Sequence, residues 1–386
     1  AVTRALLRGG ILVGLMSVPA ALLLVPAPFW LHMLEQKPEL IPGAATYARI
    51  NTLGILPFFG FSLLRGFLSA HSRTTAQLVV ILIGNLLNAV LDWAWIYGRL
   101  GFPELGIAGS AWATVVSRWF MFALLLAVAW PGLAPHLRHL RDATVRRALR
   151  EWRPLWELLK LGMPIGGQFA LEFGVFALTL LLIGQFDRAA AAGEVGGPRL
   201  GGHQVALALA SMSYMVPLGL SMAASVRVGW AVGRGDHIAV RRTTVATLCA
   251  SMAVMSTFML LFLLAPRALA MTMSNVPGIY EWAAVLIPIA GVFQILDGLQ
   301  VSAIGCLRGM GDVRMPLLAN VVGYWGVALP LGCWLAMPWG MGMGPAGLWW
   351  GLTARLGLVG VGLAFVLRWR LQDRKSTRLN SSHSSV

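Results

Sequence analysis

The chain has 386 residues, of which 58% are hydrophobic and 12% charged, and its mean hydropathy is +0.73. A water-soluble domain must solvate its surface, so this composition excludes one and indicates a polytopic membrane protein. The net charge of +15 would favour nucleic-acid binding in a soluble chain. Here the basic residues lie in short loops between apolar runs, as in membrane proteins generally, and we expect a lipid bilayer and no nucleic acid as partner.

Apolar windows long enough to cross a bilayer, which needs about 20 residues, follow one another along the chain. They lie at 11–34, 47–70, 77–98, 107–130, 157–185, 201–226, 241–265, 277–303, 316–337 and 345–368. The pattern predicts an all-α integral membrane protein with about ten transmembrane helices.

Lysine and arginine are unevenly divided between the two alternating sets of loops. One set, which includes both chain ends, carries 18 of them and the opposite set carries 6. Cytoplasmic loops are enriched in basic residues. The asymmetry therefore predicts that both ends of the chain face the cytoplasm.

Internal repetition predicts two halves. The segment GIAGSAW at 106–112 recurs as GPAGLWW at 344–350, which is six predicted helices later. A repeat unit with an even number of helices gives two halves of the same orientation in the membrane, as in parallel transporter repeats. Only four helices precede the basic segment, so we expect a twelve-helix protein of two six-helix lobes whose first two helices are missing here.

The resulting division of the chain has four parts. It comprises an incomplete N-terminal lobe (1–131), a basic cytoplasmic linker (132–156), a C-terminal lobe (157–370) and a Ser-rich tail (371–386) that resembles non-native vector sequence.

Two acids lie deep inside apolar windows of the second half. Glu172 follows Pro164 by about two helical turns, and Asp297 lies within 277–303. An acid at the centre of a membrane helix costs about 2.5–3.5 kcal/mol on insertion scales, which favours a functional role. Desolvation disfavours the charged form, so both should bind a proton or another cation readily. The alternative is a buried acid that neighbouring hydroxyls or amides satisfy.

In the first half, Asn88 and Asp92 are four residues apart and share one helix face. Asp92 is only about two turns from Gly98, so an acid at the outer interface is the alternative. Thr114 lies next to the repeated glycine motif and could add a hydroxyl ligand or serve only helix packing.

Several other motifs do not indicate their usual function, because their surroundings in the sequence do not fit it. Gly342, Gly344 and Gly347 fit GxGxxG but join two membrane helices and do not follow a strand. The RGD at 234–236 lies in a loop assigned to the cytoplasm, where no adhesion partner reaches it. His203 and Gln204 could contact a substrate, although a satisfied interfacial pair is the favoured interpretation. No nucleophile and base share a helix face, so we expect no enzymatic activity and no cofactor.

Four segments resemble the multidrug and toxic compound extrusion family, in its bacterial sodium- or proton-coupled branch. They are LGMPIGGQFALE (161–172), GGHQVALALASMSYMVPLGLSMAASVRVGWAVGRGD (201–236), ILDGLQVSAIGCLRGMGDVRMP (295–316) and GMGPAGLWWGL (342–352). The likeness covers the chain to about residue 370. It implies a monomeric exporter of cationic or amphipathic drugs in the bacterial inner membrane, driven by inward Na⁺ or H⁺.

The same resemblance implies the site residues. Glu172 and Asp297 match the family's acidic positions in the C-terminal lobe, as proton ligands or as ligands for Na⁺, and Asn88, Asp92 and Thr114 match those of the N-terminal lobe. Gln168, Phe293, Gln204 and Gln300 are the expected residues of the substrate cavity. Phe293 departs from relatives that carry a cation-binding tyrosine one turn before Asp297.

Three other functions are alternatives to this one. A flippase for lipid-linked saccharides belongs to the same superfamily, but it would favour cationic side chains that meet phosphates, whereas the intramembrane charges recognised in this sequence are acids. A passive channel and a membrane-embedded enzyme are the remaining alternatives.

Overall fold

The computed structural model describes residues 2–33, 38–39, 41–71, 73–138, 151–190 and 197–383. The chain forms two compact units, residues 1–158 and 159–386, and each is considered by itself. Residues 139–150 of the linker expected at 132–156 lie outside the described residues.

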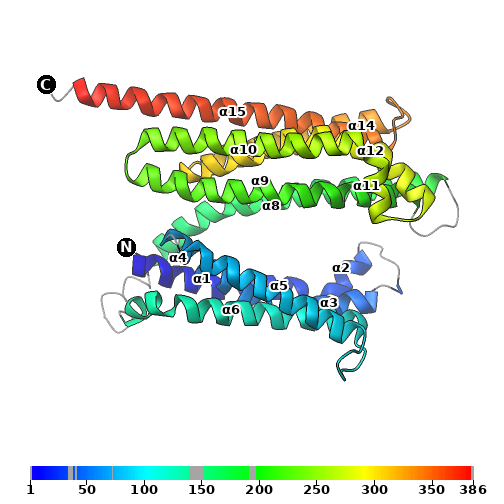
Figure 1. Cartoon of the computed structure of the whole chain (residues 1–386), viewed down its shortest axis with the longest axis horizontal. Helices are drawn as coiled ribbons and strands as arrows, with labels where there is room; N and C mark the ends of the chain where they lie inside the picture. The colour runs from blue at the N-terminus through cyan, green and yellow to red at the C-terminus, as the bar shows by residue number, and fades with distance from the viewer. Residues whose placement is uncertain are drawn as a thin grey trace. The chain divides into compact units, whose positions relative to one another are not determined.

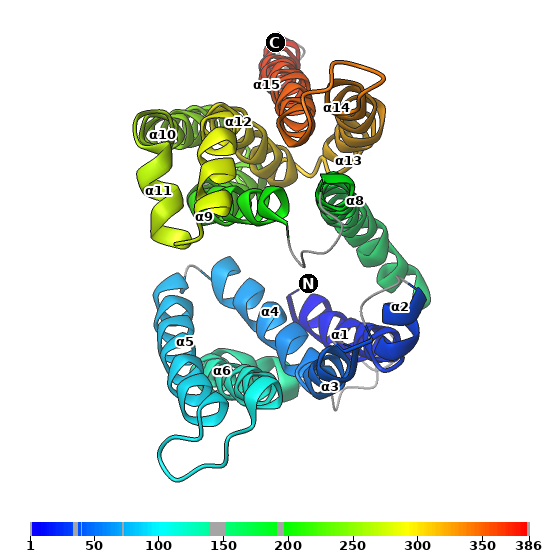
Figure 2. The ribbon, with the colours of Figure 1, turned by 90° about the vertical axis from the view of Figure 1, so that its right-hand side faces the viewer.

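The first unit is a bundle of helices (Figures 1 and 2). They are α1 (Val2–Leu24), α2 (Ala27–Met33), α3 (Ile41–Thr52), α4 (Ile55–Ala70), α5 (Thr74–Ile96) and α6 (Gly106–Arg138). Helix α6 packs against α3, α4 and α5. Its Leu125 is buried with Leu6 of α1, Leu64 of α4 and Val80 of α5, so one apolar core joins four helices.

Helices α3 and α4 follow each other with a bend of 48°, and together they are long and apolar enough to be considered as one span. Pro57 has no N–H to donate to the carbonyl of Leu53, one turn earlier, so the helical hydrogen bond is lost at the bend. The indole of Trp119 in α6 donates to that carbonyl instead, at 3.2 Å. The Arg118 side chain packs against Gly54, where a Cβ would lie 3.1 Å from its Cδ. The bend is therefore held by side chains of α6.

The second unit contains the remaining elements. They are α8 (Trp152–Ala190, which begins in the first unit), α9 (Pro198–Gly233), α10 (His237–Leu264), α11 (Pro266–Met273), α12 (Pro277–Gly309), α13 (Arg314–Val321), the π-helix η2 (Val322–Ala328), α14 (Leu329–Ala336) and α15 (Pro345–His383). Helix α12 packs against α9, α10 and α15, and Figure 2 shows it between them. It carries buried side chains on every face from Ala283 to Leu307, as expected of a central helix.

Two serine hydroxyls tie α12 to its neighbours. Ser221 of α9 donates to the carbonyl of Val301 at 2.7 Å, and Ser251 of α10 donates to the carbonyl of Gly298 at 3.0 Å. Hydrogen bonds of this kind stabilise helix packing in membranes, where apolar contact alone gives little preference over lipid. They hold the part of α12 that follows Asp297.

Among the described residues, nine helices are long and apolar enough to span a membrane, and there are up to ten if the bent pair α3 and α4 is counted as one span. The prediction of about ten membrane helices in an all-α fold is therefore confirmed. Two windows differ in detail. The window at 11–34 is interrupted before Ala27, where Pro26 precedes α2, and the window at 316–337 is divided into α13, η2 and α14.

Two turns between helices share one construction. Gly235 has φ +68° and Gly311 has φ +86°, a conformation that glycine adopts at no steric cost. An aspartate follows each glycine and accepts a backbone N–H three residues on, Asp236 from Ala239 at 2.9 Å and Asp312 from Met315 at 3.2 Å. The RGD segment is thus the end of one helix and the cap of the next.

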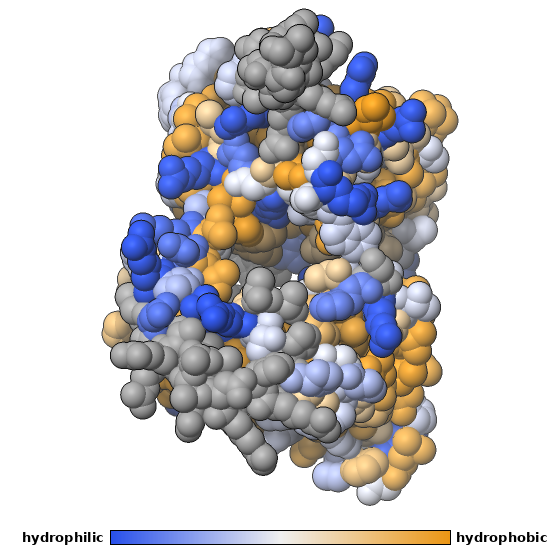
Figure 3. Space-filling view, turned by 90° about the vertical axis from the view of Figure 1, so that its left-hand side faces the viewer, coloured by the Kyte–Doolittle hydropathy of each residue, from blue (hydrophilic) through white to orange (hydrophobic). Residues whose placement is uncertain are grey.

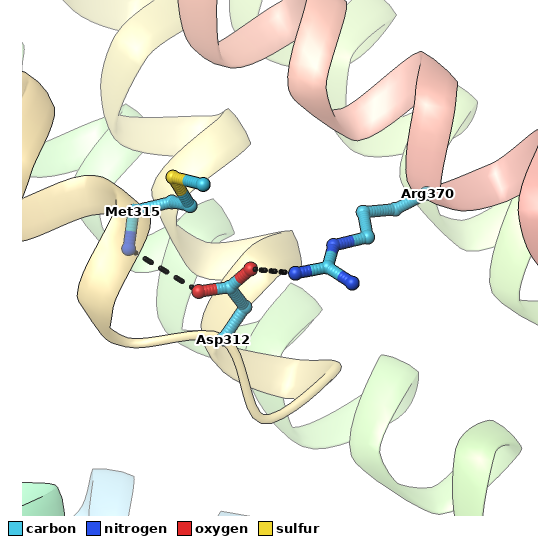
Figure 4. Close-up of polar contacts among 3 residues, drawn as sticks. All are labelled: Asp312, Met315 and Arg370. Atoms are coloured by element: carbon cyan, nitrogen blue, oxygen red, sulfur yellow. Dashed lines mark hydrogen bonds and ion pairs between the residues drawn. The ribbon is translucent and has the colours of Figure 1, made fainter.

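Asp312 also forms an ion pair with Arg370 of α15, at 2.9 Å (Figure 4). The contact joins the turn after α12 to α15. Figure 3 faces the end of the second unit that carries the α9–α10 turn and shows hydrophilic residues gathered there, with hydrophobic residues along the sides of the helices.

Candidate cation site

The two acids of the second half lie near each other in the second unit. Asp297 is near the middle of α12 and only 7% exposed. Glu172 is on α8 and is partly buried. The two carboxyl groups are close enough for their charges to interact. The fold therefore brings together, within membrane-spanning helices, the two acids that the sequence singled out.

A group of buried polar side chains lies beside these acids. Arg355 of α15 donates to the Oδ1 atom of Asn320 at 2.9 Å, and its guanidinium carbon lies 3.3 Å from the centre of the Tyr324 ring. Gln300, one turn after Asp297, donates to the same oxygen of Asn320 at a longer 3.5 Å. We refer to Glu172, Asp297, Gln300, Asn320, Tyr324 and Arg355 as the polar cluster.

The local sequence explains how the polar cluster is assembled. Tyr324 lies in the π-helix η2, a rare helical form that often marks functional sites. Pro330 follows η2 and cannot donate the hydrogen bond that would continue a regular α-helix. Gly323 leaves space for Arg355, since a Cβ there would lie 3.1 Å from the Cγ of Arg355.

Several buried atoms of the polar cluster have no hydrogen-bond partner. They are the Nε of Arg355, the Nδ2 of Asn320, the Oε1 of Gln300 and the hydroxyl of Tyr324. Buried polar atoms are almost always paired, so a group of unpaired ones suggests a site that a ligand or water completes. Two carboxylates, an amide oxygen and a hydroxyl are oxygen ligands of the kind that hard cations prefer.

Gln168, expected in the substrate cavity, lies one helical turn before Glu172 and accepts a hydrogen bond from Arg308 at 2.8 Å. The Arg308 guanidinium also lies over the Phe169 ring, at 5.5 Å. Arg308 lies beyond the window predicted at 277–303 and belongs to the last turn of α12, where its side chain joins α12 to α8.

Phe293 lies in the same buried apolar core as Tyr324, whereas Gln204 points away from it. Phe293 packs edge-on against Trp349, with ring centres 5.7 Å apart. Trp349 donates its indole N–H to the Nδ1 of the fully buried His203, at 3.1 Å. Gln204 is exposed. The His203 side chain therefore pairs with Trp349 and not with its neighbour in sequence.

The predicted residues of the first half lie in the first unit. Asn88 and Asp92 on α5 each have a buried side-chain atom without a hydrogen-bond partner, the Nδ2 and the Oδ1 respectively. The hydroxyl of Thr114 donates to the carbonyl of Ser110 in its own helix, at 3.0 Å. Asn88 and Asp92 thus keep free bonding capacity, whereas Thr114 is satisfied locally.

Arg355 is the main site residue that was not predicted from the sequence, and it adds a cation to the acids expected within the membrane. Arg355 is 1% exposed and lies within a membrane-spanning helix. The signal was present, because an arginine inside the window 345–368 carries an insertion cost similar to that of Asp297. Its partner Asn320 could not be identified from spacing, since it is 35 residues away.

In the part of the chain that the structure describes, nine to ten apolar helical spans, with charged side chains buried between them, define a polytopic α-helical membrane protein. The family model described as MatE matches residues 1–94 and 164–334, and the chain belongs to this family.

Curated relatives from bacteria support the assignment. The chain is 34% identical over 378 residues to the probable multidrug resistance protein NorM of Mesorhizobium japonicum, covering 96% of this chain and 77% of that protein. It is 36% identical over 389 residues to the multidrug resistance protein NorM of Burkholderia vietnamiensis, with the same coverage of 96% and 77%.

Solved structures share the fold at lower identity. The eukaryotic MATE transporter AtDTX14 matches with a TM-score of 0.79 and 19% identity, over 96% of this chain and 80% of that one. An outward-facing multidrug resistance MATE family transporter matches with a TM-score of 0.80 and 17% identity, over 97% and 83%.

Proposed function

We propose that the chain is a secondary active multidrug efflux transporter, which exports cationic or amphipathic compounds in exchange for inward flow of Na⁺ or H⁺. The observation that carries the proposal is the pair of the buried Asp297 and the partly buried Glu172, in membrane-spanning helices of a MatE family chain. Ionisable groups in such positions mark ion pathways and proton relays.

In this mechanism the coupling ion and the drug oppose each other. Asp297 and Glu172 take H⁺ or Na⁺, with Gln300 and Tyr324 as further oxygen donors. Binding of the ion favours the conformation that releases drug, and binding of drug favours the conformation that releases the ion. By linkage, each lowers the affinity of the other by the same factor. Asn88 and Asp92 form a second ion-binding position in the first unit, and Gln168 and Phe293 contribute to drug binding.

Multidrug export is favoured over lipid-linked saccharide flipping by the curated relatives, which are named multidrug resistance proteins. The side chains of the polar cluster favour multidrug export less strongly than the sequence suggested, because Arg355 adds a cation beside the two acids. The two acids still outnumber it within the polar cluster, which supports a cationic cargo.

The cellular setting follows from the same relatives and from the loop charges. We place the chain in the bacterial inner membrane as a monomer with both ends in the cytoplasm. It acts as a transport protein and not as an enzyme, and it uses the coupling ion without a resident cofactor.

The test is drug efflux in proteoliposomes that carry an imposed Na⁺ or H⁺ gradient, with ethidium as the transported cation. Asp297→Asn keeps the size of the side chain and removes its charge, so gradient-driven efflux should be lost. Asp236→Asn is the matched control, because asparagine caps a helix as well as aspartate does. Undiminished efflux by Asp297→Asn would refute the proposal.

A further inference from the structure

Arg355 lies too deep in its helix to reach water. It is ten residues after Pro345, the start of α15, which corresponds to about 15 Å along a helix axis. That is about half the thickness of a bilayer's hydrocarbon core. With 1% of its surface exposed, the side chain does not extend along the helix to the interface. Its charge must be balanced within the protein.

The neighbours that hold the guanidinium are neutral. Asn320 accepts one N–H, and the Tyr324 ring lies against the flat face of the group. Its Nε is buried without a partner. Among the described residues, neither Glu172 nor Asp297 lies within ion-pair distance of Arg355. The guanidinium is therefore held apart from the acids, although its charge interacts with both.

The charges around the acids can be counted. The titratable and charged groups that face them are Tyr214 of α9, Arg308 of α12, Tyr324 of η2 and Arg355 of α15. The two tyrosines are neutral when protonated. Arg308 bonds to Gln168, one turn before Glu172, and its charge acts on that acid, but its side chain is only partly buried, so water screens its charge more than that of Arg355. Two ionised acids and Arg355 leave the polar cluster with one net negative charge.

We propose that Arg355 is a fixed counter-ion of the Asp297 and Glu172 pair, and that it limits this site to one exchangeable monovalent cation. Without an internal cation, two buried carboxylates would need two monovalent cations to become neutral. Arg355 supplies one of these charges permanently, because its guanidinium stays protonated. Asn320 and Tyr324 prevent it from closing onto either acid, so both carboxylates remain available to the exchangeable ion.

This inference rests on the proposed function, and its test measures ion binding separately from transport. Binding of radioactive Na⁺ to the purified chain reports a sodium site, and the infrared band of protonated carboxyl groups, followed in a pH titration, reports a proton site. Arg355→Gln should raise the affinity for the cation by about tenfold or more, since a buried positive charge no longer repels it. Arg355→Lys keeps an ionisable cation and should raise the affinity less than Arg355→Gln does.

Charge rescue separates this role from a merely structural one. Asp297→Asn leaves Glu172 balanced by Arg355 and should abolish cation binding. The double variant Asp297→Asn with Arg355→Gln restores one net negative charge and should recover binding to within about threefold of the wild type. Arg227→Gln removes an exposed arginine of the same unit and should change nothing. Elution as a single species in size-exclusion chromatography checks the folding of each variant.

Two results would overturn the inference. One is a double variant that binds no better than Asp297→Asn, and the other is an Arg355→Gln variant that binds as Arg227→Gln does. If the wild type binds neither Na⁺ nor H⁺ at this site, both this inference and the proposed ion coupling fail. If the wild type exports drug and the Arg355 variants leave cation binding unchanged, only the counter-ion role fails.

Discussion

His203 shows how one buried polar side chain can join two distant helices. It is fully buried on α9, and its Nδ1 accepts the indole N–H of Trp349 on α15. The two rings also meet edge-on, with centres 5.7 Å apart, and Trp349 makes the same kind of contact with Phe293 of α12. One indole therefore connects α9, α12 and α15.

Trp349→Phe tests this contact. Phenylalanine keeps an aromatic ring beside Phe293 but leaves the Nδ1 of His203 without a donor, which should lower the free energy of unfolding by about 1–3 kcal/mol. Unfolding in a titration with sodium dodecyl sulfate, followed by circular dichroism, measures the loss. Trp334→Phe is the control, because that side chain is 47% exposed and should change stability little. Equal losses in the two variants would contradict the role given to the indole.

Helix α12 depends on small residues for its close approach to α9. At Gly305 an added Cβ would lie 2.8 Å from the carbonyl carbon of Ser221, which is backbone and cannot rotate away. The hydroxyl of the same serine bonds to Val301, one turn earlier on α12. Close backbone approach and an interhelical hydrogen bond thus occur at the same place, as is usual in membrane helix packing.

Gly305→Ala should therefore push α9 and α12 apart. Overpacking of this kind costs about 1–3 kcal/mol, more than the gain of about 1 kcal/mol expected from replacing a helical glycine by alanine. The control is Gly362→Ala in α15, where nothing lies within 4 Å of the added carbon. Thermal unfolding in detergent should show a lower midpoint for Gly305→Ala and an unchanged or higher one for Gly362→Ala. A midpoint for Gly305→Ala at or above the wild-type value would refute the packing argument.

For the whole molecule, the sequence predicted the number and placement of the membrane spans because a bilayer imposes a length and a composition on each one. It did not predict the π-helix at Val322–Ala328 or the bend before Pro57, since both depend on which side chains of other helices satisfy the freed backbone groups. A proline in the sequence indicates where a helix can bend or change its hydrogen-bond pattern, but it does not specify which of the two occurs.

The same difference applies to the candidate site. Asp297 and Glu172 could be found because an acid in an apolar window is costly whatever surrounds it. Arg355 could be found in the same way, as an arginine inside an apolar window, but its partners Asn320 and Tyr324 belong to the site through contacts between α15, α13 and η2, which no local pattern reveals. Thr114 was predicted as a possible ligand from its position in the sequence, but its hydroxyl is bonded within its own helix.

The orientation of the chain in the membrane is a prediction from loop charges that labelling can test. The α9–α10 turn and the α14–α15 loop lie at opposite ends of the second unit (Figure 1). Arg234 is in that turn, and Met341 is 59% exposed in that loop. The basic loops should face the cytoplasm, so Arg234 should be inside and Met341 outside.

Single cysteines at these two positions make the test, in a chain whose own Cys249, Cys306 and Cys333 are replaced by alanine. A membrane-impermeant maleimide applied to intact spheroplasts should label Met341→Cys at once. It should label Arg234→Cys only after the membrane is permeabilised, because the reagent cannot reach the cytoplasmic side. Labelling of both cysteines by a permeant maleimide controls for their accessibility. Labelling of Arg234→Cys at once, and of Met341→Cys only after permeabilisation, would reverse the predicted orientation. Both ends of the chain would then face outside, because the number of spans between each labelled position and each chain end does not change.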